Sequence, residues 1–71
     1  MTNKEKFYTA LIQDDGHLNE IDLGERMGFT EEETNQLIAQ LLADYKIDYV
    51  TNRDCNYQPI KKARRKNKTN R

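Results

Sequence analysis

Residues 23–30 read LGERMGFT, and this short stretch determines the predicted fold. Gly28 is suited to the left-handed conformation that ends a helix. Gly24 lies within the preceding helix, where glycine costs roughly 1 kcal/mol relative to alanine, so its presence favours a second helix crossing close by. Thr30 and Glu33 match a capping box, in which each side chain accepts the other's backbone N–H. The stretch therefore predicts two closely packed helices joined by a glycine turn.

The helices on either side of this turn follow from the apolar spacing. The earlier one is preceded by a short extended piece at His17-Leu18, has Asn19 as its N-cap and runs to Met27. The later one begins at Thr30 and ends near Asp44 or Tyr45. Its predicted inward stripe consists of Leu37, Ile38, Leu41, Leu42 and Tyr45.

A further helix is predicted over Asn3 to Asp14, upstream of the turn, and Asp15-Gly16 ends it. Its stripe of Phe7, Ala10 and Leu11 is widened by Tyr8 and Ile12. These last two residues either complete the core or form the seam of a homodimer. Because a core of about sixty residues is marginal, we expect a homodimer.

Two strands are expected after the third helix. Ile47 to Thr51 is rich in strand formers, residues 52–56 are polar and turn-prone, and Tyr57 to Ile60 returns as a second strand. Pro59 restricts that strand to an edge or to its end. Tyr49 and Tyr57 are interpreted as hairpin core in preference to base-stacking platforms.

With residues 23–30 as its signature, the chain resembles the winged helix-turn-helix superfamily over about residues 4–60. Gly24 stands where that family usually has alanine, and Leu37, Leu41 and Ile47 match the spacing of its third helix and first wing strand. The resemblance implies an α+β fold: a small winged helix of three helices with a C-terminal β-hairpin wing, containing two or three strands. Many winged helices bind proteins instead of DNA, so the fold alone does not give the function.

The charges are sorted along the chain. Residues 61–71, KKARRKNKTNR, hold seven of the twelve basic residues and no acid. Residues 1–60 hold all twelve acids and five basic residues, so the zero net charge combines about −7 and about +7. We expect a folded domain over residues 1–60 and a disordered basic arm over 61–71. Such arms bind nucleic acid by neutralising phosphates, although a solvated tail is the alternative.

The third helix departs from the basic pattern of its family. In helix-turn-helix proteins the N-terminal residues of this helix lie nearest the bases, and here that end is Thr30-Glu31-Glu32-Glu33. The glutamates either cap and solubilise the helix or face a protein partner. Asn35, Gln36 and Gln40 on the outer face can read base edges.

Other classes of function have little support in the sequence. Cys55 is the only cysteine and His17 the only histidine, so an intramolecular disulfide is impossible and neither catalysis nor a metal site is indicated. No cofactor or small-molecule ligand is evident. No segment is apolar enough to span a membrane or serve as a signal peptide, and we expect a cytoplasmic protein.

The function predicted from the sequence is DNA binding, as a small transcriptional regulator or accessory factor. Alternatives are a protein-interaction module that uses the acidic third helix, and RNA or ribosome association through the arm. Arg53 is predicted to enter the minor groove from the wing, with an ordinary turn residue as the alternative. The candidate nucleic-acid-binding residues are Gln36, Gln40, Arg53, Lys61, Lys62, Arg64, Arg65 and Lys66.

Overall fold

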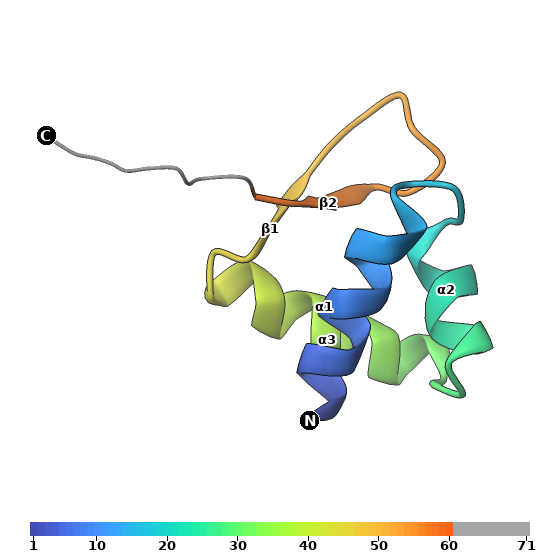
Figure 1. Cartoon of the computed structure of the whole chain (residues 1–71), viewed down its shortest axis with the longest axis vertical. Coiled ribbons are helices and arrows are strands. Elements are labelled where there is room, and N and C mark those ends of the chain that lie inside the picture. The colour runs from blue at the N-terminus through green and yellow to red at the C-terminus, as the bar shows by residue number, and fades with distance from the viewer. Residues whose placement is uncertain (61–71) are drawn as a thin grey trace, which may run out of the picture.

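The computed structural model describes residues 1–60, which form three helices and a two-stranded antiparallel sheet (Figure 1). The predicted α+β class is therefore confirmed. The elements, in chain order, are α1 (Asn3–Asp14), α2 (Glu20–Arg26), α3 (Glu31–Ala43), β1 (Ile47–Tyr49) and β2 (Tyr57–Pro59). In the sheet Ile47 lies opposite Pro59, and Tyr49 lies opposite Tyr57. As expected for a residue that lacks an N–H, Pro59 ends β2.

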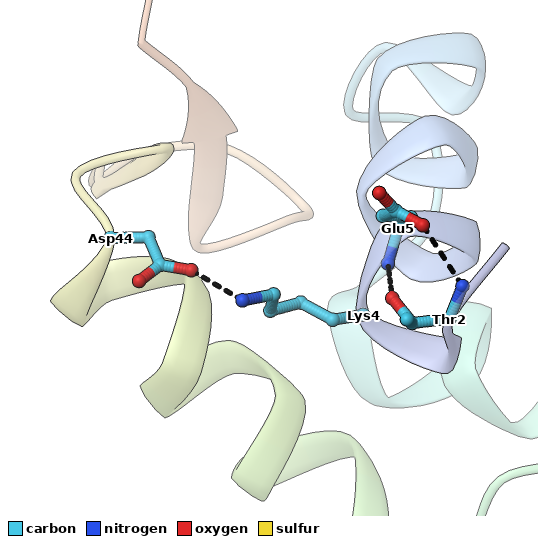
Figure 2. A network of polar contacts seen from close by, with 4 residues as sticks. All are labelled: Thr2, Lys4, Glu5 and Asp44. Atoms are coloured by element: carbon cyan, nitrogen blue, oxygen red, sulfur yellow. Dashed lines mark hydrogen bonds and ion pairs between the residues drawn. The ribbon is translucent and has the colours of Figure 1, made fainter.

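Helix α1 begins at a capping box that the sequence analysis did not identify (Figure 2). The Thr2 hydroxyl accepts the Glu5 N–H at 3.1 Å, and the Glu5 carboxylate accepts the Thr2 N–H at 2.9 Å. This backbone hydrogen bond lowers the pKa of Glu5. The helix ends where Asp15 and Gly16 both adopt positive φ values, 52° and 82°. Two successive left-handed residues turn the chain sharply towards α2.

The predicted glycine turn and both predicted caps are confirmed. The Asn19 side chain accepts the Ile21 N–H at 2.9 Å at the start of α2. Gly28 has a φ of 92° between α2 and α3. Thr30 and Glu33 form the reciprocal bonds of a capping box, at 3.0 and 2.8 Å. The turn between the two helices is thus defined by one glycine and one capping pair.

Gly24 is the point of closest approach between α2 and α3. A Cβ atom placed on Gly24 would lie 2.0 Å from the Thr34 hydroxyl oxygen and 2.9 Å from the Thr34 Cβ. Thr34 is itself fully buried, and its hydroxyl donates to the Thr30 carbonyl at 2.8 Å. The close crossing expected from a glycine within the helix is confirmed, because no larger residue fits there.

The core lies where α1 packs on α2, α3 and β2, and where α3 packs on β1. In Figure 1, α1 crosses α3 and the hairpin covers one end of the helices. The buried apolar side chains are Phe7, Leu11, Leu23, Leu37, Ile38, Leu41, Ile47 and Cys55. Among the described residues, no helix is both long and apolar enough to cross a membrane.

Some local predictions are wrong. His17 and Leu18 form bends instead of a short extended piece, and both strands are shorter than predicted. The two strands of the sheet agree with the predicted two or three. Leu42 and Tyr45 are 37% and 75% exposed, outside the inward stripe. Tyr45 has a φ of 59°, and this left-handed turn after α3 rotates its side chain away from the core. Tyr49 is 60% exposed instead of forming hairpin core, although its ring meets Tyr57 edge-on at 5.7 Å.

We predict that Gly24→Ala destabilises the fold by roughly 1–3 kcal/mol, because the added methyl group overlaps Thr34. Intrinsic helix propensity alone would change stability in the opposite direction, by about 1 kcal/mol. Urea unfolding followed by circular dichroism measures the difference. Asp22→Ala, at an exposed position of the same helix, is the matched control. A Gly24→Ala protein as stable as the parent would contradict the observed crossing.

At Gly28 the space is open but the backbone is left-handed. Apart from Gly28 and its two chain neighbours, no atom lies within 4 Å of a Cβ placed there. L-Alanine at this position should cost about 1–2 kcal/mol through the left-handed backbone alone. D-Alanine, introduced by chemical synthesis of the chain, favours positive φ and should leave stability unchanged or raise it. The comparison is made by thermal unfolding. Equal losses for the two enantiomers would show that space, not φ, requires glycine.

Candidate nucleic-acid interface

The outer face of α3 is the first part of the candidate interface. Burial of Thr34, Leu37, Ile38 and Leu41 fixes one side of this helix against the core. The side chains of Asn35, Gln36 and Gln40 are therefore exposed. The amide groups of these residues each offer donors and an acceptor to a partner. Gln36 and Gln40 are one turn apart, so they lie on the same stripe of the helix.

The N-terminal end of this face is acidic. Glu33 is engaged in the capping box, while Glu31 and Glu32 are exposed. Together with Asn35, Gln36 and Ala39, these two glutamates line an open, shallow hollow on the helix surface. Acidic side chains stabilise a helix N-terminus through the helix dipole. They also repel phosphate, so this end of α3 is unfavourable for contact with a nucleic-acid backbone.

Residues 52–56, within the loop between the two strands, are tied to the α1–α2 junction by a buried carboxylate. Glu20 is only 7% exposed at the first position of α2. Its two carboxylate oxygens accept the Asn56 backbone N–H at 2.9 Å and the Asn56 side-chain amide at 3.1 Å. The Asn19 side-chain amide adds a bond to the Asp54 carbonyl at 3.3 Å. The loop is therefore held by contacts between residues 35 or more positions apart.

Cys55 is the apolar anchor of the same loop, and sequence reasoning missed it. Its side chain is 2% exposed and belongs to the hydrophobic core. The thiol donates to the Tyr57 carbonyl at 3.1 Å. Burial raises the pKa of Cys55, and the nearby Glu20 carboxylate raises it further. The residue type alone could have indicated that Cys55 is buried, because cysteine is a small hydrophobic residue that is frequently buried, even in a polar stretch.

Arg53 is exposed at the tip of this loop but its guanidinium lies back against the end of α1. Its Nη2 atom donates to the Asp15 carbonyl at 3.4 Å. A Cβ atom on Gly16 would lie 2.4 Å from the same nitrogen, so the glycine provides the space for the guanidinium. Figure 1 shows this loop beside the α1–α2 junction, away from the N-terminal end of α3. No hydrogen bond within residues 1–60 joins Arg53 to Gln36 or Gln40.

The remaining basic residues of the folded domain are distributed over α1, α2 and the end of α3. Lys4 pairs with Asp44 at 2.6 Å, the one ion pair within residues 1–60, and links α1 to the C-cap of α3 (Figure 2). The Lys46 ammonium lies 5.9 Å from the centre of the Tyr8 ring. Lys6 and Arg26 are exposed.

The predicted basic arm starts beside the C-terminal end of α3. The Ile60 N–H donates to the Lys46 carbonyl at 2.9 Å, and the Lys46 N–H donates to the Leu41 carbonyl of α3 at 2.9 Å. This fixes the point from which the seven basic residues of the arm continue. The predicted contacts Lys61, Lys62, Arg64, Arg65 and Lys66 lie outside the described residues.

The remaining candidate residues occupy separate places. Tyr8 is half-buried against the core, while Ile12 is 48% exposed. His17 is exposed, and its Nδ1 atom lies 2.6 Å from the Asp14 carbonyl. Within residues 1–60, no three His, Cys, Asp or Glu side chains are grouped closely enough to hold a metal ion.

Comparison of the chain with protein-family models, with curated proteins and with solved structures found no match. The resemblance to winged helix-turn-helix proteins therefore rests on residues 23–30 and on the order of the elements.

We predict that Glu20→Gln loosens the 52–56 loop. One of the two Asn56 donors would then face an amide NH₂ group, which costs roughly 1–3 kcal/mol when buried. The alkylation rate of buried Cys55 by iodoacetamide reports loop opening, and it should rise in step with the loss of stability. Glu25→Gln, at an exposed position of α2, is the control and should change neither quantity. Unchanged Cys55 reactivity in Glu20→Gln would refute the proposed anchoring.

Proposed function

We propose that this protein is a winged helix-turn-helix protein that binds nucleic acid, with duplex DNA as the favoured partner, and acts as a small transcriptional regulator or accessory factor. The observation that supports this best is the geometry of α2, the Gly28 turn and α3. In this arrangement α3 is held by its inner face and presents Asn35, Gln36 and Gln40 outward. A helix presented in this way fits the major groove, where amide side chains can bond to adenine.

The sorted charges supply the affinity in this proposal. The folded domain carries a formal charge of about −7 and cannot be drawn to a polyanion by itself. The arm carries about +7 and would release counterions from the phosphates that it neutralises. Its starting point at Ile60 lies beside Lys46 and the C-terminal end of α3. The arm can therefore reach phosphates that flank the outer face of this helix.

Arg53 has a conditional role in the same complex. Its present bond to the Asp15 carbonyl is long, at 3.4 Å, and its side chain is exposed. Exchanging that bond for a stronger one to a phosphate or a groove edge is energetically accessible. Arg53 would then act as the wing contact, while the rest of the loop stays fixed by Glu20 and Cys55.

A protein-interaction module is the second candidate, favoured by the N-terminal end of α3. Glu31 and Glu32 are exposed beside a surface hollow, and neither forms an ion pair within residues 1–60. A basic protein segment would complement this end of the helix, whereas DNA would be repelled by it. The arm would then be a solubilising tail or an RNA contact.

The DNA-binding proposal predicts a steep salt dependence that is lost with the arm. Each phosphate contact adds about 0.9 to the slope of log affinity against log salt concentration on duplex DNA. For the full-length chain, this slope should correspond to several phosphate contacts. A chain ending at residue 60 should show almost no binding. Fluorescence anisotropy with a labelled duplex, at two or more salt concentrations, measures both.

Two point variants separate the candidate functions. Arg53→Ala should weaken duplex binding and leave single-stranded RNA binding nearly unchanged if the wing enters a groove. Glu32→Gln should modestly strengthen DNA binding by removing a repulsion, but weaken binding of a basic protein partner. A full-length chain that ignores duplex DNA even at low salt would rule out the regulator and favour the interaction module.

A further inference from the structure

A cavity of about 300 Å³ lies between the C-terminal end of α1 and the hairpin. This volume is at the lower end of the range typical for small-molecule sites. One part of its lining is apolar and comes from two elements and the residue after the second: Leu11 of α1, Tyr57 and Pro59 of β2, and Ile60. The cavity is separate from the outer face of α3, but it shares Arg53 with the proposed nucleic-acid interface.

Arg53 places a positive group in the wall of this cavity. A guanidinium has five N–H donors, and the one hydrogen bond that Arg53 makes within residues 1–60 is the 3.4 Å contact with the Asp15 carbonyl. It also forms no ion pair with a carboxylate of the described residues. The missing side chain at Gly16 leaves the space in which the guanidinium sits. Arg53 is therefore positioned to donate two parallel hydrogen bonds to a carboxylate, in the geometry that arginine favours.

The opposite charge is present in the same cavity. Asp15 and Asp48 both line it, and neither forms an ion pair within residues 1–60. The C-terminal end of α1 also faces this region, and its carbonyl groups form the negative end of the helix dipole. A simple anion would meet repulsion from the aspartates, and a simple cation would meet repulsion from Arg53. A molecule that carries both charges a few ångströms apart would satisfy both sides.

We propose that this cavity binds a free α-amino acid with an apolar side chain. The ligand carboxylate pairs with the Arg53 guanidinium, and its ammonium group faces Asp15 and Asp48. Its side chain occupies the apolar wall formed by Leu11, Tyr57, Pro59 and Ile60. This inference goes beyond the proposed nucleic-acid function and does not depend on it, because its test contains no nucleic acid. Occupation of the site would keep the Arg53 guanidinium beside the end of α1, where it lies in this structure.

Three probes that share one phenyl ring test the proposal. L-Phenylalanine carries both charges, 3-phenylpropanoate lacks the ammonium group, and 2-phenylethylamine lacks the carboxylate. Each is titrated into the ¹⁵N-labelled full chain, and amide chemical shifts are followed. We expect L-phenylalanine to shift the resonances of residues 15–16, 48, 53 and 57–60 with a dissociation constant on the order of 1 mM. Each singly charged probe should bind at least tenfold more weakly.

Substitutions locate the site. Arg53→Lys keeps the positive charge but removes the planar guanidinium that can donate two hydrogen bonds to one carboxylate, so it should weaken L-phenylalanine binding several-fold. Arg53→Met also removes the charge and should abolish binding. Arg26→Met, at an exposed arginine on α2, is the control and should leave binding unchanged. Amide spectra of the free variants establish that each is folded. Absence of shifts up to 20-fold above the expected dissociation constant, equal shifts with 3-phenylpropanoate, or unchanged binding in Arg53→Met would each overturn the proposal.

Discussion

The contact between Gly24 and Thr34 is the constraint on which the rest of the fold depends. At the crossing of α2 and α3 there is no room for even one additional carbon atom. Thr34 is fully buried there and donates to the carbonyl of Thr30, which is also the N-cap of α3. One site therefore sets the separation of two helices, the start of the second and its rotation about its own axis. That rotation determines which side of α3 packs inward and which side is available to a partner.

The hairpin depends on a second, polar constraint. Two strands of three residues each form a sheet too small to be stable by itself. The hairpin is fixed instead at its base by Ile47 in the core, and at its loop by Glu20 and Cys55. Because Glu20 begins α2, the loop is positioned by the same helix that contacts Thr34. The loop backbone cannot move away from the α1–α2 junction unless a buried carboxylate loses both of its hydrogen bonds.

The parts of the fold that could be predicted from sequence are those governed by local chemistry. Helix caps, the positive φ of Gly28 and the end of β2 at Pro59 each follow from what one residue type can do. The errors at Tyr45 and Tyr49 have a different origin, because helical and strand periodicity does not show where an element stops. Local reasoning gives no signal for the role of Glu20, and for Cys55 the residue type is the only local signal. Their roles arise from contacts with residues far away in the chain or buried in the core, and a carboxylate in a first helical turn is usually explained by the dipole alone.

The structure indicates which part of α3 can approach a polyanion, because it shows where the arm starts relative to this helix. The charges beside the two ends of α3 differ: Glu31 and Glu32 are exposed at its start, whereas Lys46 and the starting point of the arm lie beside its C-terminal end. Two unit charges 4 Å apart in water interact by about 1 kcal/mol, and salt screens them over about 8–10 Å. The glutamates therefore repel phosphates only near the first turn of α3. Gln40 lies more than two turns further along the helix, where this repulsion is weak and where the basic arm can contribute. If DNA is the partner, α3 should thus approach it with the part of the helix beyond its first turn, where Gln36 and Gln40 lie, in contrast to the N-terminal approach that most helix-turn-helix proteins use.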